Sequence, residues 1–202
     1  MTAEPLVLAT RNEGKLRELA RILGDQVPLA GLGSFPGAPD VPETGATFEE
    51  NALLKARAIA GYTGLPAVAD DSGLCVDALN GMPGVLSARW AGRHGDDKAN
   101  LDLVLAQVAD VPDARLGARF VCAAALVAPV DGTAGEWVVT GELGGRLIRA
   151  PRGSGGFGYD PIFLPDGFER TTAEMTPDAK DAISHRGRAF RALAPFITGR
   201  PT

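Results

Sequence analysis

The chain has 202 residues, 45% of them hydrophobic and 22% charged, which is the composition of an ordinary folded protein and excludes a disordered one. Lys and Arg number 20 against 25 Asp and Glu, which gives a formal net charge of −5. The sequence has no run of basic residues that could bind along a phosphate backbone, so we expect no nucleic-acid partner. No apolar run has the length of a membrane span and the start lacks a secretory signal, which predicts a cytoplasmic protein with no membrane partner.

The length is sufficient for one sizeable hydrophobic core and short for two independent ones. We therefore expect residues 1–202 to form a single domain. Cys75 and Cys122 each lie inside an apolar segment. This placement predicts buried free thiols and argues against a disulfide framework or a zinc cluster.

The N-terminal half alternates predicted strands and helices. Residues 6–10 (LVLAT) read as a short buried strand, and the leucines of 15–23 recur at helical spacing. A second helix opens with Thr47 and Glu50 in capping-box spacing and is expected to close at Gly61. Strand, tight loop and helix in this order are typical of an α/β protein.

The next segments predict one more strand, one more helix and a hairpin. Residues 66–70 (PAVAD) read as a buried strand, and Asp96 can cap a helix with an apolar face. Residues 118–130 and 135–148, joined by a turn at Asp131-Gly132, are typical of a long antiparallel hairpin. The sheet should therefore be mixed.

The C-terminal segment predicts two helices. Thr176-Pro177 can start a short helical turn, and Ser184 can cap a last helix with Phe190 and Leu193 facing inward. Pro195 lies within this last helix and is expected to kink it.

The loop TRNEGK, residues 10–15, joins a strand end to a helix start. Backbone N–H groups and the helix dipole favour an anion at such a place, and Lys15 adds a positive charge. The Walker pattern is absent. For this segment taken alone, a plain turn with a surface lysine is the favoured interpretation.

The sequence GSGGFG, residues 153–158, has the letters of a dinucleotide fingerprint but not its context. The fingerprint requires a following helix, whereas an extended PIFLP segment follows here. We interpret it as a flexible backbone that passes close to a ligand, with Phe157 available to stack on a planar ring. A tight loop with Phe157 in the core is the alternative.

Two further groups carry possible chemistry. In SHRGRAF, His185 and Arg186 start a helix, where both can donate hydrogen bonds outward, although a lone histidine is more often structural and an arginine solvated. In PAVADDSGL, Asp70 and Asp71 end a buried strand and must face opposite sides if the strand continues through them. One should act on a ligand while the other supports it, unless both merely make turn hydrogen bonds.

A carboxylate at this position can hold a hard cation such as Mg²⁺ or accept a proton from water. Glu43 could supply a second oxygen, and Asn51 and Lys55, four residues apart, share one helix face. Cations, acids, an aromatic ring and a histidine donor together suit a nucleoside triphosphate with a metal.

Six motifs in fixed order carry a family resemblance that extends from about Leu6 to Leu193. The chain resembles the ITP/XTP pyrophosphatases, which remove non-standard purine nucleotides, in LATRNEGKLREL, PETGATFEENALLKA, AVADDSGL, PGVLSARWAG, GSGGFGYDPIF and AISHRGRA. Arg11 is a departure, because many relatives have a small residue there, and the departure bears on the fine geometry of the phosphate loop.

The resemblance implies a role for each matching residue. Asp71 would be the general base with Lys55 beside it, and Glu43 and Asp71 would hold Mg²⁺. The residues implied to bind the nucleoside triphosphate are Thr10, Arg11, Asn12, Glu13, Gly14, Lys15, Ser72, Phe157, Gly158, Tyr159, Asp160, Lys180, His185 and Arg186.

The resemblance also implies the architecture and the reaction. The expected fold is α/β, with a long mixed, partly antiparallel sheet, flanking helices and two lobes around a central cleft, in a homodimer. The expected reaction is attack of water on the α-phosphorus of ITP, dITP or XTP, giving the monophosphate and pyrophosphate. Two alternatives are a pyrophosphatase for pyrimidine or other modified nucleotides and a nucleotide sensor that does not hydrolyse its ligand.

Overall fold

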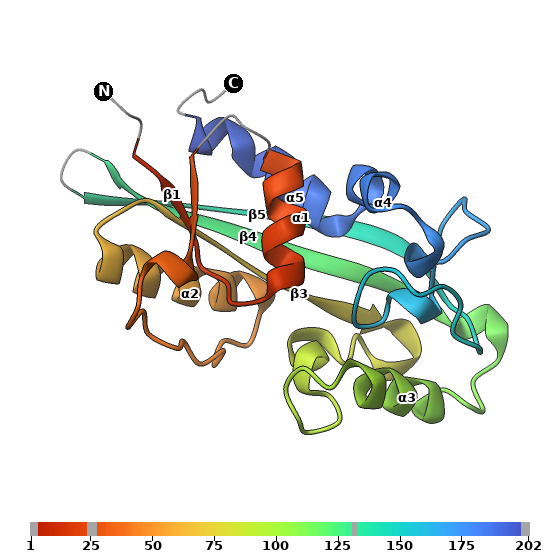
Figure 1. Cartoon of the computed structure of the whole chain (residues 1–202). Coiled ribbons are helices and arrows are strands. Elements are labelled where there is room, and N and C mark those ends of the chain that lie inside the picture. The colour runs from red at the N-terminus through yellow and green to blue at the C-terminus, as the bar shows by residue number, and fades with distance from the viewer. Residues whose placement is uncertain (1–3, 24–27, 131–132, 199–202) are drawn as a thin grey trace. The chain divides into compact units, whose positions relative to one another are not determined.

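The computed structural model describes residues 4–23, 28–130 and 133–198. These residues form an α/β arrangement of strands and helices (Figure 1). In chain order the elements are β1 (Leu6–Leu8), α1 (Glu13–Leu23), β2 (Leu29–Gly31), α2 (Phe48–Thr63), β3 (Ala67–Val76), α3 (Asp97–Gln107), β4 (Gly117–Val130), β5 (Thr133–Leu147), β6 (Phe163–Pro165), α4 (Pro177–Ile183) and α5 (His185–Ile197), with short 3₁₀ segments between them.

The strands form one six-stranded sheet in the order β2-β1-β3-β4-β5-β6. β1 is parallel to β2 and to β3, with Val7 opposite Ala67, because helices connect these strands. β6 is antiparallel to β5, with Leu147 opposite Phe163. The expected mixed sheet is therefore confirmed, while the turn expected at Asp131-Gly132 lies outside the described residues.

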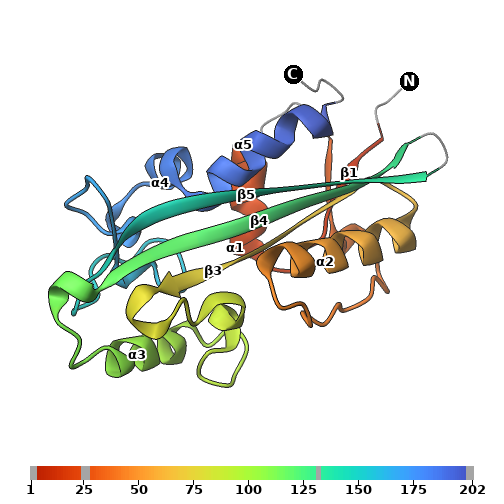
Figure 2. The same ribbon diagram turned by 180° about the vertical axis from the view of Figure 1, so that it is seen from behind.

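The chain divides into two compact units, and β3, β4 and β5 contribute residues to both. The first unit comprises residues 1–71, 122–141 and 186–202. In it α1 and α5 pack against one face of the sheet through Leu19, Phe190 and their neighbours, and α2 covers the opposite face (Figures 1 and 2). β1 and the parts of β3 and β4 in this unit are buried on both faces, which explains their apolar runs.

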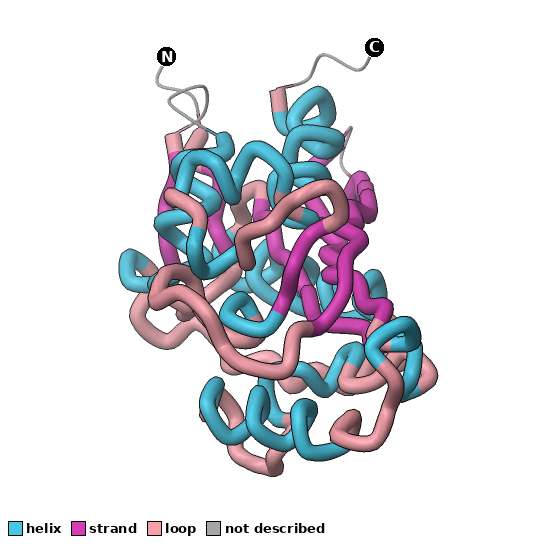
Figure 3. Tube along the Cα trace, turned by 90° about the vertical axis from the view of Figure 1, so that its right-hand side faces the viewer, coloured by secondary structure: helices cyan, strands magenta, loops and turns pink. Residues whose placement is uncertain are grey.

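The second unit comprises residues 72–121 and 142–185. Its core joins the ends of β3, β4 and β5 to α3 and β6, with Val104, Phe120 and Phe163 among its buried residues. Residues 148–159 contain neither helix nor strand and form a long loop (Figure 3).

Three of the predicted helix starts are confirmed by their caps. Thr47, Asp96 and Thr176 are N-caps whose side chains accept hydrogen bonds from backbone N–H groups of the first turn. The predicted end of α2 at Gly61 is wrong, because the helix continues to Thr63 and ends where Gly64 takes the left-handed conformation at φ 69°.

Both cysteines are free and buried, as expected. No helix among the described residues is long and apolar enough to cross a membrane.

Candidate active site

Asp70 and Asp71 both lie within β3, which continues through them to Val76. Adjacent residues of a strand point to opposite faces, so the two carboxylates meet different partners. Lys15 of α1 pairs with Asp70, whereas Lys55 of α2 pairs with Asp71. The prediction that the two acids face opposite sides is therefore confirmed.

Asp71 belongs to a small cluster, the acid–lysine cluster, formed by Glu43, Asn51, Lys55 and Asp71. Lys55 Nζ lies 2.7 Å from Glu43 Oε1 and 3.6 Å from Asp71 Oδ1. Asn51 Nδ2 donates to Asp71 Oδ2 at 3.0 Å. Asn51 and Lys55 share one face of α2, as their spacing predicted.

The electrostatics of this cluster suit a base. Burial raises the pKa of Asp71, the Lys55 ammonium opposes that rise and the Glu43 carboxylate adds to it, so that the net pKa lies above the usual aspartate value. Burial alone would lower the pKa of Lys55, but the nearby carboxylates, Asp71 foremost, raise it. Lys55 is thus held as a cation beside a carboxylate that accepts a proton more readily than an ordinary aspartate.

The donor set of the cluster fits a metal that arrives with a ligand. Glu43 and Asp71 converge on one cation, Lys55, so their oxygens can share a positive charge. Among the described residues no group of three or more His, Cys, Asp or Glu side chains could hold a metal alone. Two carboxylates completed by phosphate oxygens are typical of magnesium–nucleotide sites.

Asp70 belongs to a buried ionic network with Lys15, Glu18 and Arg186. Its Oδ2 lies 3.0 Å from Lys15 Nζ and 3.2 Å from Arg186 Nε, and Arg186 Nη1 also pairs with Glu18. Burial would raise the pKa of Asp70, but Lys15 and Arg186 hold it well below its usual range. Asp70 is therefore a permanent anion that fixes two cations.

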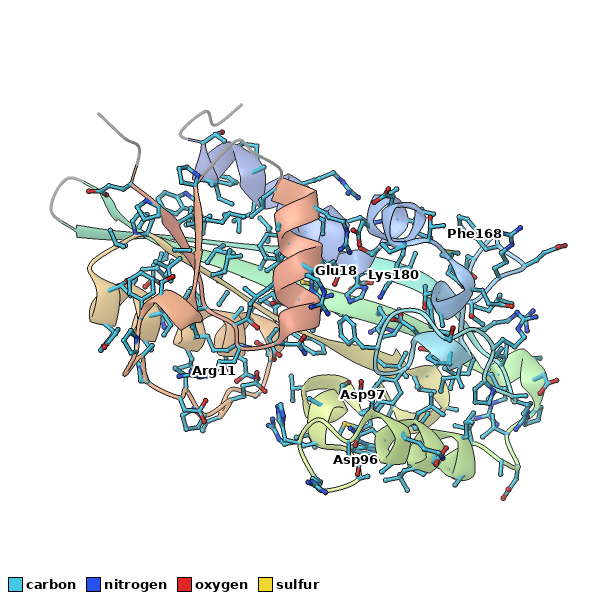
Figure 4. The ribbon with its side chains drawn as sticks, viewed as in Figure 1. Arg11, Glu18, Asp96, Asp97, Phe168 and Lys180 are labelled. Carbon is cyan, nitrogen blue, oxygen red and sulfur yellow. The ribbon has the colours of Figure 1, made fainter. Side chains whose placement is uncertain are left out.

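The segment from Thr10 to Lys15 leads from β1 into the first turn of α1, so the predicted change from strand to helix is confirmed. Asn12 caps the helix through its Oδ1, which accepts from Lys15 N–H at 3.0 Å, and Thr10 Oγ1 accepts from Asn12 N–H at 3.1 Å. Arg11 Nη2 donates to Ala38 O at 2.7 Å, which ties the loop to a distant segment (Figure 4). The neighbouring predicted residues Glu13 and Gly14 form the first turn of α1.

In the second unit, the glycine loop, residues 153–158, is organised by Asp160. The Asp160 carboxylate accepts from Phe157 N–H at 2.9 Å, from Thr172 Oγ1 at 2.7 Å and from Lys180 Nζ at 2.6 Å. Lys180 Nζ also lies 5.0 Å from the centre of the Phe157 ring, within range of a cation–π interaction. Phe157, Asp160 and Lys180, which the resemblance implies for nucleoside binding, are therefore brought together.

Three other predicted residues of this unit differ in burial. The Tyr159 hydroxyl donates to Ser87 O at 2.8 Å and its ring belongs to the core, so only its backbone borders the loop. Gly158 N–H donates to Asp97 Oδ2 at 2.8 Å. Ser72 directly follows Asp71 in β3 and is half-buried.

His185 and Arg186 differ from the sequence-based expectation. Both side chains are buried, at 6% and 2% exposure, so neither donates into open solvent, and a ligand of His185 must reach it in the interior. The His185 ring stacks on Phe120 with centroids 4.8 Å apart, and the Arg186 guanidinium is bonded to carboxylates. α5 starts inside the protein because these two groups find partners there.

Sequence reasoning missed Glu18 and Thr172. Glu18 is 3% exposed on α1 and pairs with a residue 168 positions away (Figure 4). An acid next to Leu19 on an apolar helix face was the available signal. Thr172 gave no such signal, because a threonine in a loop is ordinary.

Comparison with known proteins decides the family. The model of the Ham1 family matches residues 6–196. The chain belongs to the Ham1 family. The resemblance stated from the sequence motifs is thereby confirmed.

Relatives and solved structures are similar to this chain over nearly its whole length. The chain is 65% identical to the dITP/XTP pyrophosphatase of Streptomyces coelicolor over 195 residues, covering 95% of this chain and 96% of that protein. A crystal structure of the nucleoside-triphosphatase / dITP/XTP pyrophosphatase of Mycobacterium abscessus is 58% identical, with a TM-score of 0.77 over 95% of this chain and 99% of that chain. The HAM1 protein of Coxiella burnetii is 42% identical, with a TM-score of 0.87 over 98% of this chain and 100% of that chain. The predicted α/β fold class is that of these structures.

Proposed function

We propose that this Ham1 protein hydrolyses the non-standard purine nucleoside triphosphates ITP, dITP and XTP to the monophosphate and pyrophosphate. The observation that carries the proposal is Asp71, a buried carboxylate of raised pKa beside Lys55 and Glu43. A pure nucleotide binder gains little from such a positioned base. The name of the Streptomyces coelicolor relative at 65% identity supports the same reaction and substrate class.

In the proposed reaction Asp71 accepts a proton from water. The water oxygen forms a bond to the α-phosphorus, the bond from that phosphorus to the bridging oxygen of the β-phosphate breaks, and pyrophosphate leaves. Lys55 and Lys15 are two cations of the first unit that can stabilise negative charge on the phosphates. We propose that both act on the substrate while Asp70 keeps Lys15 in place.

Glu43 and Asp71 are the residues we propose to hold Mg²⁺, together with phosphate oxygens of the substrate. When bound, the metal would supply Lewis-acid stabilisation of charge on the phosphates.

The proposed purine site uses the glycine loop and His185. Phe157 offers a ring for stacking on the base, and the Lys180 ammonium lies over that ring. A donor from His185 matches the 6-keto group of hypoxanthine or xanthine, whereas adenine presents an amino donor at that position. Arg186 is assigned to the support of Asp70, because its donors are bonded to Asp70 and Glu18.

We further propose a homodimer in the cytoplasm, where the nucleotide pool is located. Light scattering of the purified protein during size-exclusion chromatography tests the dimer, and elution at the mass of a single 20.9 kDa chain contradicts it.

The test of the function is a product assay with ITP, XTP, dITP, GTP and ATP offered separately with Mg²⁺. We expect monophosphate and pyrophosphate from the first three and little from GTP or ATP. Asp71→Asn tests the base, because it keeps the size of the side chain and removes its charge. This variant should lower turnover by at least about 10³-fold with a modest loss of binding.

Every other result of the product assay contradicts the mechanism or supports one of the alternatives. Diphosphate plus phosphate would move the attack to the γ-phosphorus and overturn the mechanism. Tight binding without turnover would support a nucleotide sensor, and a preference for pyrimidine nucleotides would support the related enzyme class. Wild-type turnover in Asp71→Asn would remove Asp71 from the role of base.

A further inference from the structure

The backbone donors of the glycine loop are bonded to the protein itself. Gly155 N–H donates to Ala173 O at 2.9 Å, Phe157 N–H to Asp160 Oδ2 at 2.9 Å and Gly158 N–H to Asp97 Oδ2 at 2.8 Å. A loop that cradles an anion must instead point its N–H groups at the ligand. This loop therefore offers the Phe157 side chain, and not these three amides, to a ligand.

The segment under the loop is a capping box made by Thr171 and Glu174. Thr171 N–H donates to Glu174 Oε2 at 2.7 Å, and Thr171 Oγ1 accepts from the backbone N–H of Glu174. Thr171 is fully buried, and its hydroxyl donates to Arg152 O at 2.9 Å, the residue immediately before the glycine loop. One threonine thus closes the capping box and ties the loop to it.

Two glycines allow the loop to lie against this segment. A Cβ on Gly153 would lie 2.5 Å from the carbonyl carbon of Ala173, and Gly153 has a φ of +83°. A Cβ on Gly155 would lie 2.9 Å from Ala173 O. The sequence-based interpretation that the glycines bring the backbone close to a ligand is corrected: at these two positions the close neighbour is the chain's own backbone.

We propose that Thr171–Glu174 is a platform that positions the glycine loop, and with it Phe157, for a planar purine base, with Thr171 as its key positioning residue. The inference rests on the proposed function, because it takes Phe157 as the surface for the nucleoside. The platform acts through Arg152 O and the Gly155 N–H and does not touch the substrate. The platform therefore affects nucleotide affinity without taking part in the reaction at the phosphates.

The first test replaces Thr171. Thr171→Val removes the hydroxyl at nearly constant volume, and Thr171→Ser restores it. We expect Thr171→Val to raise KM for ITP about threefold to tenfold, because the hydroxyl's buried hydrogen bonds with Arg152 O and Glu174 N–H are lost. We expect kcat to stay within about twofold and Thr171→Ser to recover the wild-type KM. An unchanged KM in Thr171→Val, or an equal fall of kcat in both variants, overturns the proposal.

Thr63→Val is the matched control. Its hydroxyl also donates to one backbone carbonyl, Ile59 O at 2.8 Å, and accepts from one backbone N–H, that of Leu65 at 3.3 Å. It lies at the end of α2 in the first unit and outside the proposed machinery. A KM shift of equal size in Thr63→Val would show that the effect is a general loss of stability and would overturn the platform.

The second test adds a methyl group. Gly155→Ala places a Cβ against Ala173 O, whereas Gly61→Ala, on an open face of α2, meets nothing within 4 Å. We expect Gly155→Ala to raise KM for ITP by about threefold or more and Gly61→Ala to leave it unchanged. Wild-type KM in Gly155→Ala contradicts close seating of the loop on the platform.

A measurement without nucleotide separates this inference from the proposed function. Amide hydrogen exchange of a peptide spanning Gly155–Gly158 should be slow in the wild type and faster in Thr171→Val, but unchanged in Thr63→Val. Equal exchange in wild type and Thr171→Val overturns the platform whatever the enzyme hydrolyses. Faster exchange in a protein that fails to hydrolyse ITP would retain the platform and reject the proposed function.

Discussion

At the scale of single residues, Asp70 and Asp71 have opposite electrostatic roles although they are neighbours. Burial raises the pKa of Asp71, whereas Lys15 and Arg186 lower that of Asp70 against the effect of its burial. The charged form of Asp70 thus stabilises the fold, and the charged form of Asp71 costs stability. This difference is typical of a supporting residue next to a reactive one.

The two aspartates should therefore respond differently to neutralisation. Asp70→Asn leaves Lys15 and Arg186 with one fewer buried partner and should cost about 3 kcal/mol of unfolding free energy at neutral pH. This cost should persist to about pH 5 and shrink as the pH falls below about 4, where the unfolded aspartate takes up its proton. Urea unfolding of the variant and the wild type at several pH values measures it.

Asp71→Asn should not destabilise the protein at neutral pH. The folded Asp71 carboxyl binds its proton more tightly than the unfolded one, so wild-type stability falls as the pH rises through the window above about 4, and the neutral side chain escapes this loss. Asparagine can still accept the hydrogen bond from Asn51. A loss in Asp71→Asn as large as in Asp70→Asn would contradict the assignment of the two roles.

At the scale of elements, α5 begins with two residues that belong to different clusters. His185 stacks on Phe120 of β4, and Arg186 reaches Asp70 of β3. The first turn of the helix is thus fixed by one aromatic and one ionic contact. Such a start fixes the His185 ring more firmly than a solvent-exposed helix end would.

We expect His185→Ala to loosen base selectivity. The ratio of kcat/KM for ITP to that for ATP should fall about 10-fold to 100-fold, since the variant lacks the donor that we propose for the 6-keto group. The phosphate contacts should persist, because Lys15 and Lys55 lie in the first unit. Steady-state kinetics of both nucleotides measures the ratio, and His94→Ala, at the exposed second histidine, is the control. An unchanged ratio in His185→Ala would exclude the role.

Local features of the elements were predictable from the sequence, and long-range partners were not. The caps Thr47 and Asp96 follow from spacing within one turn, and the alternation of Asp70 and Asp71 follows from strand geometry. The three-residue strand β2 was missed because its sequence LAG is half-buried and shows neither a period nor the strongly apolar run that reveals LVL of β1. The pairing of Glu18 with Arg186 depends on the packing of α1 beside α5, which no local pattern encodes.

At the scale of the whole molecule, the proposed function requires a chain with a net negative charge to bind a polyanionic substrate. The net charge is −5, yet Lys15 and Lys55 are both held near buried acids in the first unit. Local charge, rather than net charge, decides the field at a site. Glu43 and Asp71 would repel a bare triphosphate, so the substrate should enter together with a divalent cation.

Metal and nucleotide binding should therefore be coupled. Chelation with EDTA should abolish turnover, added Mg²⁺ should restore it, and the melting temperature without nucleotide should not change, because no described cluster of three or more metal-ligating side chains is present. Calorimetric titration of Mg²⁺ should give little heat with the protein alone and clear binding once a non-hydrolysable ITP analogue is present.

In Glu43→Gln, which keeps a hydrogen-bond acceptor for Lys55 but loses the charge, the coupled binding should weaken while the melting temperature stays near that of the wild type. Tight Mg²⁺ binding to the nucleotide-free protein would instead require a metal site complete in protein ligands, and that result would reject the coupling.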